Sequence, residues 1–309
     1  QSARICSRPE VEIIPYFPHD LLARTKRTFV QAKTDGLPEN MTWFGAQIAG
    51  HKTQLKDGKQ QLGFIKDNSC PEYIFKPVMQ DKRGICEKNF YTAIFSSSAP
   101  QCLHFLRPLL PQYEGIKEIT YYGERHELLQ LEDISEHFVI PAIIDVKIGQ
   151  RTFGPDASAE KMRKEQEKYP PQEQVGFRLL GYKIESGGKI KIAEKNREEC
   201  LNLRTEDIQD ALAEFFSHRG SDVHIIIDAL LEQLKKIKIA AQLGIYHIFS
   251  SSLLIAYEAD REAQPRAEIR MIDFSHVFAG NGKPDENYLF GVNKLVEFLQ
   301  NIRNGHGYA

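Results

Sequence analysis

The sequence predicts an α+β protein with two lobes, a small β-rich lobe followed by a larger lobe of mixed helices and strands. The length of 309 residues corresponds to two structural units at roughly 150 residues per unit. Residues 43–134 read as short β-rich runs bounded by Asp, Asn, Ser and Pro, whereas long aliphatic repeats at helical spacing follow residue 139. We therefore divide the chain into an N-terminal extension (1–40), an N-lobe (41–134) and a C-lobe (135–309).

The expected elements follow from hydrophobic periodicity and from turn residues. In the N-lobe we expect strands at 63–65, 73–78 and 128–131, and a helix that starts near Arg83. In the C-lobe we expect strands at 140–147, 175–184 and 252–257, and helices at 156–168, 205–216, 223–237 and 289–302. Thr205 is the expected N-cap of its helix, because Ser and Thr side chains accept hydrogen bonds from the first free amides of a helix.

Charge and cysteine content exclude several classes of protein. Forty Lys and Arg residues against 42 Asp and Glu residues give a net charge of −2, so we expect neither nucleic-acid binding nor stable membrane association. The five cysteines form no CxxC pair, which indicates reduced thiols. No segment approaches the roughly 18 apolar residues of a membrane span, and no signal peptide is visible. We expect a monomer in the cytoplasm, the nucleus or both.

The first candidate site residue is Lys76, which alternates with apolar residues in a predicted strand. A strand lysine paired with a glutamate on the next helix, here Glu87, is how two-lobed kinases bind nucleotide phosphates. The structural alternative is an edge-strand lysine that faces solvent. No GxGxxG precedes Lys76, and no Walker A motif occurs in the chain.

The second candidate is the pair Asp145 and Lys147, at the end of a predicted buried strand. Residues two apart on a strand share one face, so this carboxylate and this ammonium group can serve a hydroxyl nucleophile and a phosphoryl group together. The alternative is a surface ion pair, which contributes little.

The third candidate is the polar segment 156–168. If it is helical, Lys161, Lys164 and Lys168 fall at i, i+3 and i+7 on one face, which suits a small ligand with several phosphates. The alternative is a solvated helix, because Glu160, Glu165 and Glu167 interleave with the lysines.

The fourth candidate is Asp273, which ends a predicted strand and is followed by Phe274. An acid at such a position can bind Mg²⁺ between phosphate groups. His276 lies three residues further on, where a histidine would serve a phosphate site. The order of the four features is that of a kinase-like ATP site, of the protein-kinase or ATP-grasp type. The glycine of a DFG motif and an HRD loop are absent, which disfavours an ordinary protein kinase.

Three ordered motifs then give the chain a resemblance to the inositol polyphosphate kinases. They are Pro141-x-x-x-Asp145-x-Lys147-x-Gly149, Ser251-Ser252-Leu253-Leu254 and Ile272-Asp273-Phe274. Ala49-Gly50-His51, Leu131-Glu132-Asp133 and Gly176-Phe177 extend the resemblance, which covers roughly residues 43–303. The short segment 151–169 resembles the multikinase branch most, although Ala157-Ser-Ala-Glu-Lys161 also occurs in the hexakisphosphate kinases.

The resemblance implies a role for each matched position. Lys76 would bind ATP phosphates with Glu87 orienting it, and Glu132 and Ile134 would offer backbone groups to adenine in the hinge. Nucleotide binding would thus fall to Lys76, Glu87, Glu132, Ile134, Asp145 and Asp273. Substrate binding would fall to Lys147, Lys161, Lys164, Lys168, Lys183 and His276, in a pocket built around residues 151–170. Asp145 and Lys147 would be catalytic, and Asp273 would hold Mg²⁺.

The resemblance also implies an activity, the transfer of the γ-phosphate of ATP to hydroxyls of soluble inositol tris- and tetrakisphosphates, with ATP and Mg²⁺ as cofactors. Some multikinases have glutamines where this chain has Lys164 and Glu165, which affects the phosphate count of the pocket. Three alternatives remain open. They are a hexakisphosphate kinase that forms pyrophosphates, an inactive inositol phosphate-binding scaffold, and a kinase acting on phosphoinositide head groups in membranes.

Overall fold

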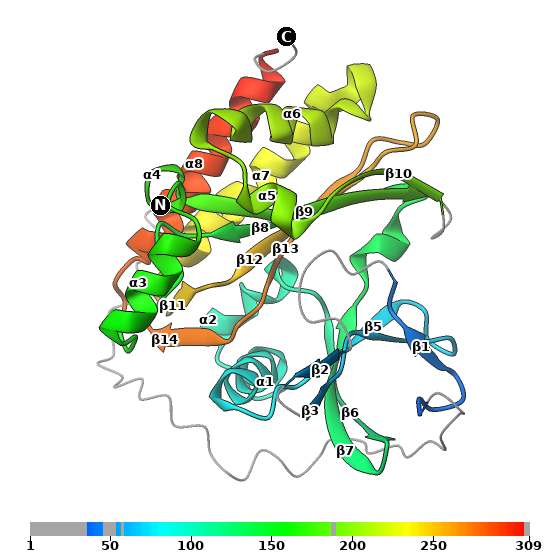
Figure 1. The fold of residues 1–309 in the computed structure, drawn as a ribbon. Helices are drawn as coiled ribbons and strands as arrows, with labels where there is room; N and C mark the ends of the chain where they lie inside the picture. Colours follow the sequence, from blue (N-terminus) through cyan, green and yellow to red (C-terminus); the bar gives the residue numbers. More distant parts are fainter. Residues whose placement is uncertain (1–35, 46–53, 57–58, 187–189, 306–309) are drawn as a thin grey trace, which may run out of the picture.

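The computed structural model describes residues 36–45, 54–56, 59–186 and 190–305 (Figure 1). Residues 1–35 of the predicted extension and the motif Ala49-Gly50-His51 lie outside the described residues.

An antiparallel sheet of five strands, the first sheet, comes first in the chain. Its order is β1 (Met41–Trp43), β4 (Ile65–Asp67), β5 (Tyr73–Pro77), β7 (Glu124–Glu132) and β6 (Tyr113–Tyr121). A separate hairpin joins β2 (Gln54–Lys56) and β3 (Lys59–Gln61). The strands predicted at 73–78 and 128–131 are confirmed, but Gly63 and Phe64 precede β4 rather than belong to it.

Helix α1 (Lys82–Phe95) begins where the sequence predicts a helix near Arg83. The Asp81 side chain accepts hydrogen bonds from the amides of Arg83 and Gly84, which satisfies free donors at the helix start. The short helix α2 (Gln101–His104) and the 3₁₀ turn η2 (Arg107–Leu109) connect α1 to the hairpin of β6 and β7.

A second antiparallel sheet follows in the order β10 (Ile190–Lys195), β9 (Phe177–Ser186), β8 (Pro141–Ile148), β12 (Ser252–Glu258) and β13 (Ala267–Ile272). Alternate residues of β8 face opposite sides of this sheet. Ala142, Ile144 and Val146 enter the main hydrophobic core, whereas Ile143 joins a small separate cluster on the other face. This second face, which carries Asp145 and Lys147, is turned toward the first sheet.

Three long helices cover the core face of the second sheet (Figure 1). They are α6 (Ile208–Ser217), α7 (Val223–Gln242) and α8 (Glu286–Arg303). The remaining elements are η3 (Ile134–His137), α3 (Ala159–Lys168), α4 (Gln172–Val175), α5 (Arg197–Leu201), η4 (Thr205–Asp207), η5 (Gly220–Asp222), and the strand pair β11 (Tyr246–Phe249) and β14 (His276–Ala279).

At two predicted boundaries, a short helical turn stands where the element was expected to begin. Residues 205–207 form the 3₁₀ turn η4, so α6 begins at Ile208 and Thr205 is not its N-cap. Residues 172–175 form α4, which ends at Gly176 with a φ of 77°, so β9 begins at Phe177 rather than Val175. In both cases a single helical turn precedes the element, and hydrophobic periodicity does not resolve so short a turn.

Close packing of α8 fixes the end of β8. Gly149 ends this strand with a φ of 113°, and its amide donates to the carbonyl of Gly176 at 2.8 Å. A Cβ atom on Gly291 of α8 would lie 2.2 Å from that carbonyl oxygen and 2.7 Å from the Gly149 nitrogen. Only glycine allows the helix to come this close. The close packing holds Gly149, two residues after Lys147, against α8.

Phe274 packs against helix α1 within the main hydrophobic core. Its side chain is fully buried, and its ring stacks on Phe90 of α1 at 4.1 Å and meets Tyr91 edge-on at 5.4 Å. Offset and edge-to-face aromatic pairs stabilise beyond their buried area. The residue that follows Asp273 therefore anchors the end of β13 to α1.

Two further predictions concern cysteines and membranes. Cys70, Cys86, Cys102 and Cys200 are free, as expected, and Cys6 lies outside the described residues. In the described part of the chain, no helix is long and apolar enough to cross a membrane.

Candidate active site

Asp145 and Lys147 lie side by side on the face of β8 that is turned toward the first sheet, as the spacing predicts. Both residues are more than nine-tenths buried, with 4% and 9% of their surface exposed. Burial, together with the charge of Asp273, raises the pKa of Asp145 to about 6. Burial also lowers the pKa of Lys147, although Asp273 and Asp145 oppose that shift. The two charged groups therefore lie on a largely buried sheet face rather than in a surface ion pair.

The ammonium group of Lys147 is held by the turn between β11 and β12. Its Nζ donates to the carbonyl oxygen of Ser250 at 2.6 Å and to the Ser250 hydroxyl at 2.9 Å. Ser250 has a φ of 58°, a left-handed conformation that costs a non-glycine residue free energy. This strained turn thus orients the lysine along the sheet face.

Lys76 bridges the two halves of the site. Its Nζ lies 2.7 Å from Glu87 Oε1 on α1 and 2.6 Å from Asp273 Oδ1 at the end of β13. Burial alone would lower the pKa of Lys76, but the carboxylates of Asp273 and Glu87 raise it above its usual value. The predicted pairing of Lys76 with Glu87 is confirmed, and Asp273 joins it as a second partner.

Asp273 leaves the strand in a left-handed conformation with a φ of 65°. The amide of the next residue, Phe274, donates to Glu87 Oε1 at 3.3 Å, so Glu87 fixes both Lys76 and the backbone beside Asp273. The Asp273 side chain is 36% exposed and remains accessible to a ligand. Strained non-glycine residues cluster at functional sites, and Ser250 and Asp273 both border this one.

The connection between the sheets offers a backbone edge beside an apolar patch. The amide of Glu132 donates to the carbonyl of Gln112 at 2.8 Å. Glu132 and Ile134, whose backbone groups the resemblance assigns to adenine, both lie at this connection. Ile134, Phe138, Ile143 and Ala256 form the small cluster, with Leu254 packed against it. Leu254 and Ile143 flank Asp145 on the same sheet face.

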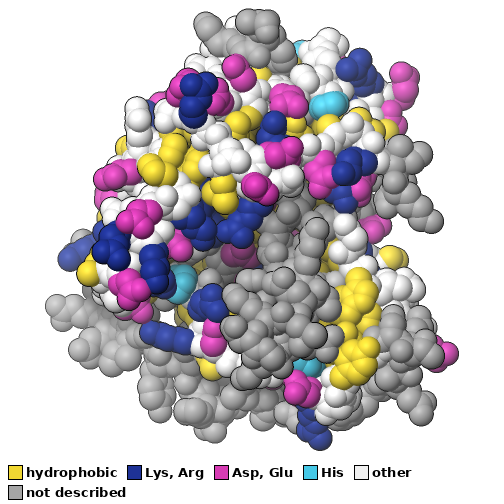
Figure 2. Space-filling model, in the orientation of Figure 1, with side chains coloured by type: hydrophobic (Ala, Val, Ile, Leu, Met, Phe, Trp, Pro, Cys, Tyr) yellow, Lys and Arg dark blue, Asp and Glu magenta, His cyan; other side chains and the backbone are white. Residues whose placement is uncertain are grey.

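Helix α3 is confirmed within the predicted segment 156–168, with Ser158 as its N-cap. On the face drawn in Figure 2, Lys and Arg side chains gather over α3 and next to it, with acidic side chains between them. Lys164 forms an i,i+4 ion pair with Glu160 at 2.6 Å, and both side chains are about two-thirds exposed. Lys168 lies 3.6 Å from Glu165. Lys161 is close enough to His276 that its positive charge contributes to lowering the pKa of that histidine.

Glu165 differs from the other glutamates of α3 because it points inward. It lies four residues after Lys161, so it shares the predicted lysine face. It accepts a hydrogen bond from the Thr152 hydroxyl at 3.0 Å, and it lies 3.8 Å from Arg178, which is 2% exposed. Although burial opposes the shift, Lys168, Thr152 and Arg178 lower the pKa of Glu165. This carboxylate therefore ties α3 to the strand β9 beside Lys147.

The other two predicted substrate residues occupy different surroundings. His276 begins β14, and burial and the positive charge of Lys161 lower its pKa, so the imidazole is neutral at pH 7. Lys183 shares the sheet face of Asp145 but forms an ion pair with Glu185 at 2.5 Å and donates to the carbonyl of Gly45 at 3.1 Å. The structure thus places His276 near Lys161 and Lys147, and engages Lys183 in a contact with the first sheet.

Comparison with known proteins identifies this arrangement. The family model described as inositol polyphosphate kinase matches residues 128–300. The chain belongs to the inositol polyphosphate kinase family. This membership confirms the resemblance drawn from the three motifs and identifies the chain as an inositol phosphate kinase.

Relatives of the family support the same assignment. The chain is 29% identical to inositol polyphosphate multikinase beta of Arabidopsis thaliana, over 83% of this chain and 91% of that protein. It is 29% identical to the Homo sapiens inositol polyphosphate multikinase, over 84% of this chain and 61% of that protein. The match to inositol hexakisphosphate kinase 3 of Homo sapiens is 28%, over 59% of this chain and 53% of that protein.

A solved structure shares the fold. The inositol phosphate multikinase Ipk2 of S. cerevisiae, crystallised with ADP and Mn²⁺, superposes with a TM-score of 0.60 at 24% identity, over 74% of this chain and 98% of that chain. The α+β, kinase-like architecture that the sequence predicts is therefore confirmed.

Four residues of this chain that lie beside the site were not predicted to have a role in it. They are Ser250, Leu254, Phe274 and Arg178. Leu254 and Phe274 lie within the motifs that carry the resemblance, so their positions were available from the sequence without their contacts. Arg178 has a weaker signal, a charged residue inside a predicted buried strand. Nothing in the sequence marks Ser250 as the partner of Lys147.

The raised pKa of Asp145 predicts that its ionisation destabilises the fold. Between about pH 4 and pH 6 the folded protein binds this proton more tightly than the unfolded chain, so the free energy of unfolding decreases as pH rises through that window. Asp145→Asn cannot ionise. We expect it to exceed wild type in unfolding free energy by about 1–3 kcal/mol at pH 7.5 and by about half as much at pH 5. Urea unfolding of both proteins at the two pH values measures this difference.

An equal difference in unfolding free energy at both pH values would contradict this interpretation, because it would show that burial does not raise the pKa of Asp145. Asp156→Asn is the matched control, since Asp156 is a half-exposed acid near the same site.

Proposed function

We propose that this protein transfers the γ-phosphate of ATP to hydroxyl groups of soluble inositol tris- and tetrakisphosphates, as a multikinase-like member of its family. The observation that carries the proposal is the convergence of the Lys76–Glu87–Asp273 contacts with Asp145 and Lys147, because Asp273 affects the pKa of both β8 residues. Phosphoryl transfer needs such positioned charges more than covalent chemistry.

The residues present suit a divalent cation, which we propose is Mg²⁺. In the described ranges, no group of three or more His, Cys, Asp and Glu residues could hold a metal. Mg²⁺ in kinases is commonly bound through one or two carboxylates, with phosphate oxygens and water as the other ligands. Asp273, half-buried and accessible, is the carboxylate we assign to it. The bound cation would neutralise charge on the phosphates of ATP, and the yeast relative was crystallised with ADP and Mn²⁺.

The chain's own residues then divide the work. Lys76 would bind phosphate oxygens of the nucleotide while Glu87 keeps its ammonium group in place. Lys147 would stabilise negative charge on the transferring group, in surroundings where burial strengthens each electrostatic contact. Asp145, with a pKa of about 6, is ionised at pH 7 and can accept the proton of the attacking hydroxyl.

The lysine face of α3 is the region we propose for binding the substrate's phosphates. Lys161→Ala is expected to raise the KM for an inositol tetrakisphosphate by about 10-fold and the KM for ATP less than 2-fold, since a lost charge-assisted contact costs about 1.5 kcal/mol. Initial-rate measurements with one substrate varied at a time give both constants.

Arg163→Ala is the matched control for this variant, because Arg163 lies on the same helix and pairs with Glu167 at 3.7 Å, away from the site. Equal losses of affinity for both substrates in Lys161→Ala would assign Lys161 a structural role instead.

A panel of soluble inositol phosphates with three to six phosphates tests the proposed function. Purified protein is incubated with ATP and Mg²⁺, and the products are separated by charge. Conversion of tris- and tetrakisphosphates to pentakisphosphate is the expected result. Turnover of the hexakisphosphate alone would identify a pyrophosphate-forming kinase, and binding without turnover would identify an inactive scaffold. Co-sedimentation with anionic vesicles would favour a membrane phosphoinositide kinase.

A further inference from the structure

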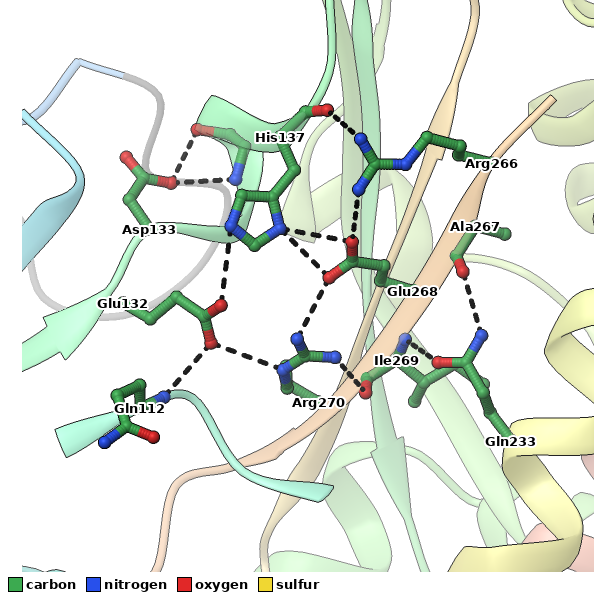
Figure 3. Close-up of polar contacts among 11 residues, drawn as sticks. Gln112, Glu132, Asp133, His137, Gln233, Arg266, Ala267, Glu268, Ile269 and Arg270 are labelled. Atoms are coloured by element: carbon green, nitrogen blue, oxygen red, sulfur yellow. Dashed lines mark hydrogen bonds and ion pairs between the residues drawn. The ribbon is translucent and has the colours of Figure 1, made fainter. Parts of the chain in front are cut away.

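A network of charged side chains connects the hinge segment, residues 132–138, to the edge of the second sheet (Figure 3). Glu132 ends β7 in the first sheet, and Glu268 and Arg270 lie on β13 in the second. Arg270 lies between the two carboxylates, with its Nε 3.4 Å from Glu132 Oε2 and its Nη2 3.0 Å from Glu268 Oε2. Glu132, Glu268 and Arg270 are each less than one-fifth exposed, so water screens their contacts only in part.

The Glu132 carboxylate is held on the hinge side as well. Its Oε2 atom accepts a hydrogen bond from the amide of Gln112 at 3.1 Å, and its Oε1 atom lies 3.4 Å from His137 Nε2. The amide of Glu132 donates to the Gln112 carbonyl, so Glu132 and Gln112 form a closed pair of contacts. The position of this side chain therefore sets the position of the backbone where the hinge begins.

The strand that carries Arg270 is itself held firmly. β13 is an edge strand, and Gln233 of α7 satisfies two of its backbone groups: it donates to the carbonyl of Ala267 at 2.8 Å and accepts from the amide of Ile269 at 2.9 Å (Figure 3). An edge strand satisfied in this way cannot slide without losing both contacts. Arg270 is therefore a fixed support for Glu132.

The same strand reaches the candidate active site. Arg270 lies opposite Leu254 of β12, which lies opposite Asp145 of β8, so all three occupy one row on the same sheet face. Two strand spacings of about 4.8 Å separate Arg270 from Asp145. Three residues beyond Arg270 in sequence, Asp273 leaves the strand. Arg270 thus connects the backbone edge proposed for adenine with the strand that positions Asp273.

We propose that Arg270 is a positioning residue for nucleotide binding, which holds the hinge through Glu132 at the orientation that adenine requires. The proposal rests on the proposed function, because it takes the hinge as the adenine site. Arg270 would act through Glu132 and would not contact the nucleotide itself. Its effect should therefore appear in the affinity for nucleotide and not in the chemical step.

Charge balance supports a specific outcome for substitution of Arg270. With Arg270 removed, Glu132 keeps its contacts with the Gln112 amide and with His137, and it faces Glu268 across His137. The two carboxylates then repel without the guanidinium group between them. Arg266 offers a matched control for the contact with Glu132. It also contacts Glu268, at 3.0 Å, and it donates to the carbonyl of His137 at 3.0 Å, but it is half-exposed and makes no contact with Glu132. Support of the Glu132 end of the hinge therefore distinguishes Arg270 from Arg266.

The test compares wild type with Arg270→Gln, Arg270→Lys and Arg266→Gln by two measurements on the full chain. Hydrogen exchange in nucleotide-free protein follows the amides of Gln112 and of residues 132–138, and titration gives the dissociation constant of ADP with Mg²⁺. We expect Arg270→Gln to speed exchange and to weaken ADP binding, each by about 10-fold, within the usual range of coupling between sites. Arg270→Lys should lie between this variant and wild type in both measurements, and Arg266→Gln should bind ADP within 2-fold of wild type.

The double variant Glu132→Gln with Arg270→Gln should bind ADP no more weakly than Arg270→Gln alone, because the two groups act through one contact. Unchanged exchange in Arg270→Gln, or faster exchange with unchanged ADP affinity, would overturn the proposal. Equal losses of ADP affinity in Arg270→Gln and Arg266→Gln would also overturn it. Failure of the wild-type protein to bind ADP would refute the proposed function, while the exchange rates would still decide whether Arg270 holds the hinge.

Discussion

Replacing Lys147 with alanine is expected to lower kcat by about 10³-fold or more, within the range for losing a charge that stabilises a phosphoryl-transfer transition state. The ammonium group lies on the same face of β8 as Asp145, and Ser250 orients it through two hydrogen bonds. Burial makes each of its contacts stronger than a contact in water. No other lysine of the described chain shares that position, opposite Ser252 in the centre of the second sheet.

The fold should survive this substitution. Lys147 lies on the face of the sheet that borders the site. The main hydrophobic core is on the other face, where β8 contributes Ala142, Ile144, Val146 and Ile148. Circular dichroism and the urea midpoint should therefore match those of wild type closely. Lys191→Ala, which removes an exposed lysine paired with Glu194, is the control for loss of one positive charge. Turnover near the wild-type rate in a folded Lys147→Ala protein would remove Lys147 from the proposed mechanism.

Asp273→Asn should abolish the divalent-cation dependence of nucleotide binding. We expect the affinity for ATP with Mg²⁺ to fall about 10- to 100-fold, because one carboxylate oxygen ligand and its charge are lost. Affinity measured in EDTA should change little, so the ratio of the two dissociation constants is the informative quantity. The substitution also removes one of the two carboxylate partners of Lys76, and the pKa of Lys76 should fall as a result.

A control separates these two effects of Asp273→Asn. Glu87→Gln removes the other partner of Lys76 and leaves Asp273 in place. It should weaken nucleotide binding with and without Mg²⁺ alike, since it acts on the phosphate-binding lysine. An Asp273→Asn protein that binds nucleotide as wild type does under both conditions would exclude the proposed metal role.

Much of the site was predictable because its residues are marked by local pattern. A charged residue at the end of an apolar strand must face a functional surface or solvent, and this reasoning identifies Asp145, Lys147 and Asp273. The helical spacing after Asp81 likewise places Glu87 on the buried side of α1, toward Lys76. Each of these inferences needs only the period of one element.

Partnerships between distant residues were not predictable in the same way. The lysine face of α3 was expected from i, i+3 and i+7 spacing, but the direction of that face depends on Thr152 and Arg178, which lie on other elements. The spacing therefore could not show that Glu165 points inward while Lys164 pairs outward with Glu160. The contact of Arg270 with Glu132 is of the same kind, since 138 residues separate the two in sequence.

Label transfer from ATP tests directly whether this protein moves the γ-phosphate to an inositol phosphate. Wild-type protein is incubated with Mg²⁺ and an inositol trisphosphate, and with ATP labelled either at the γ-phosphate or at the α-phosphate. We expect γ-label to appear in a more anionic inositol phosphate, one label for each ADP formed, and α-label to stay in the nucleotide. Binding of both ligands with no γ-label in any inositol phosphate, for each member of the tris- to hexakisphosphate series, would contradict this expectation.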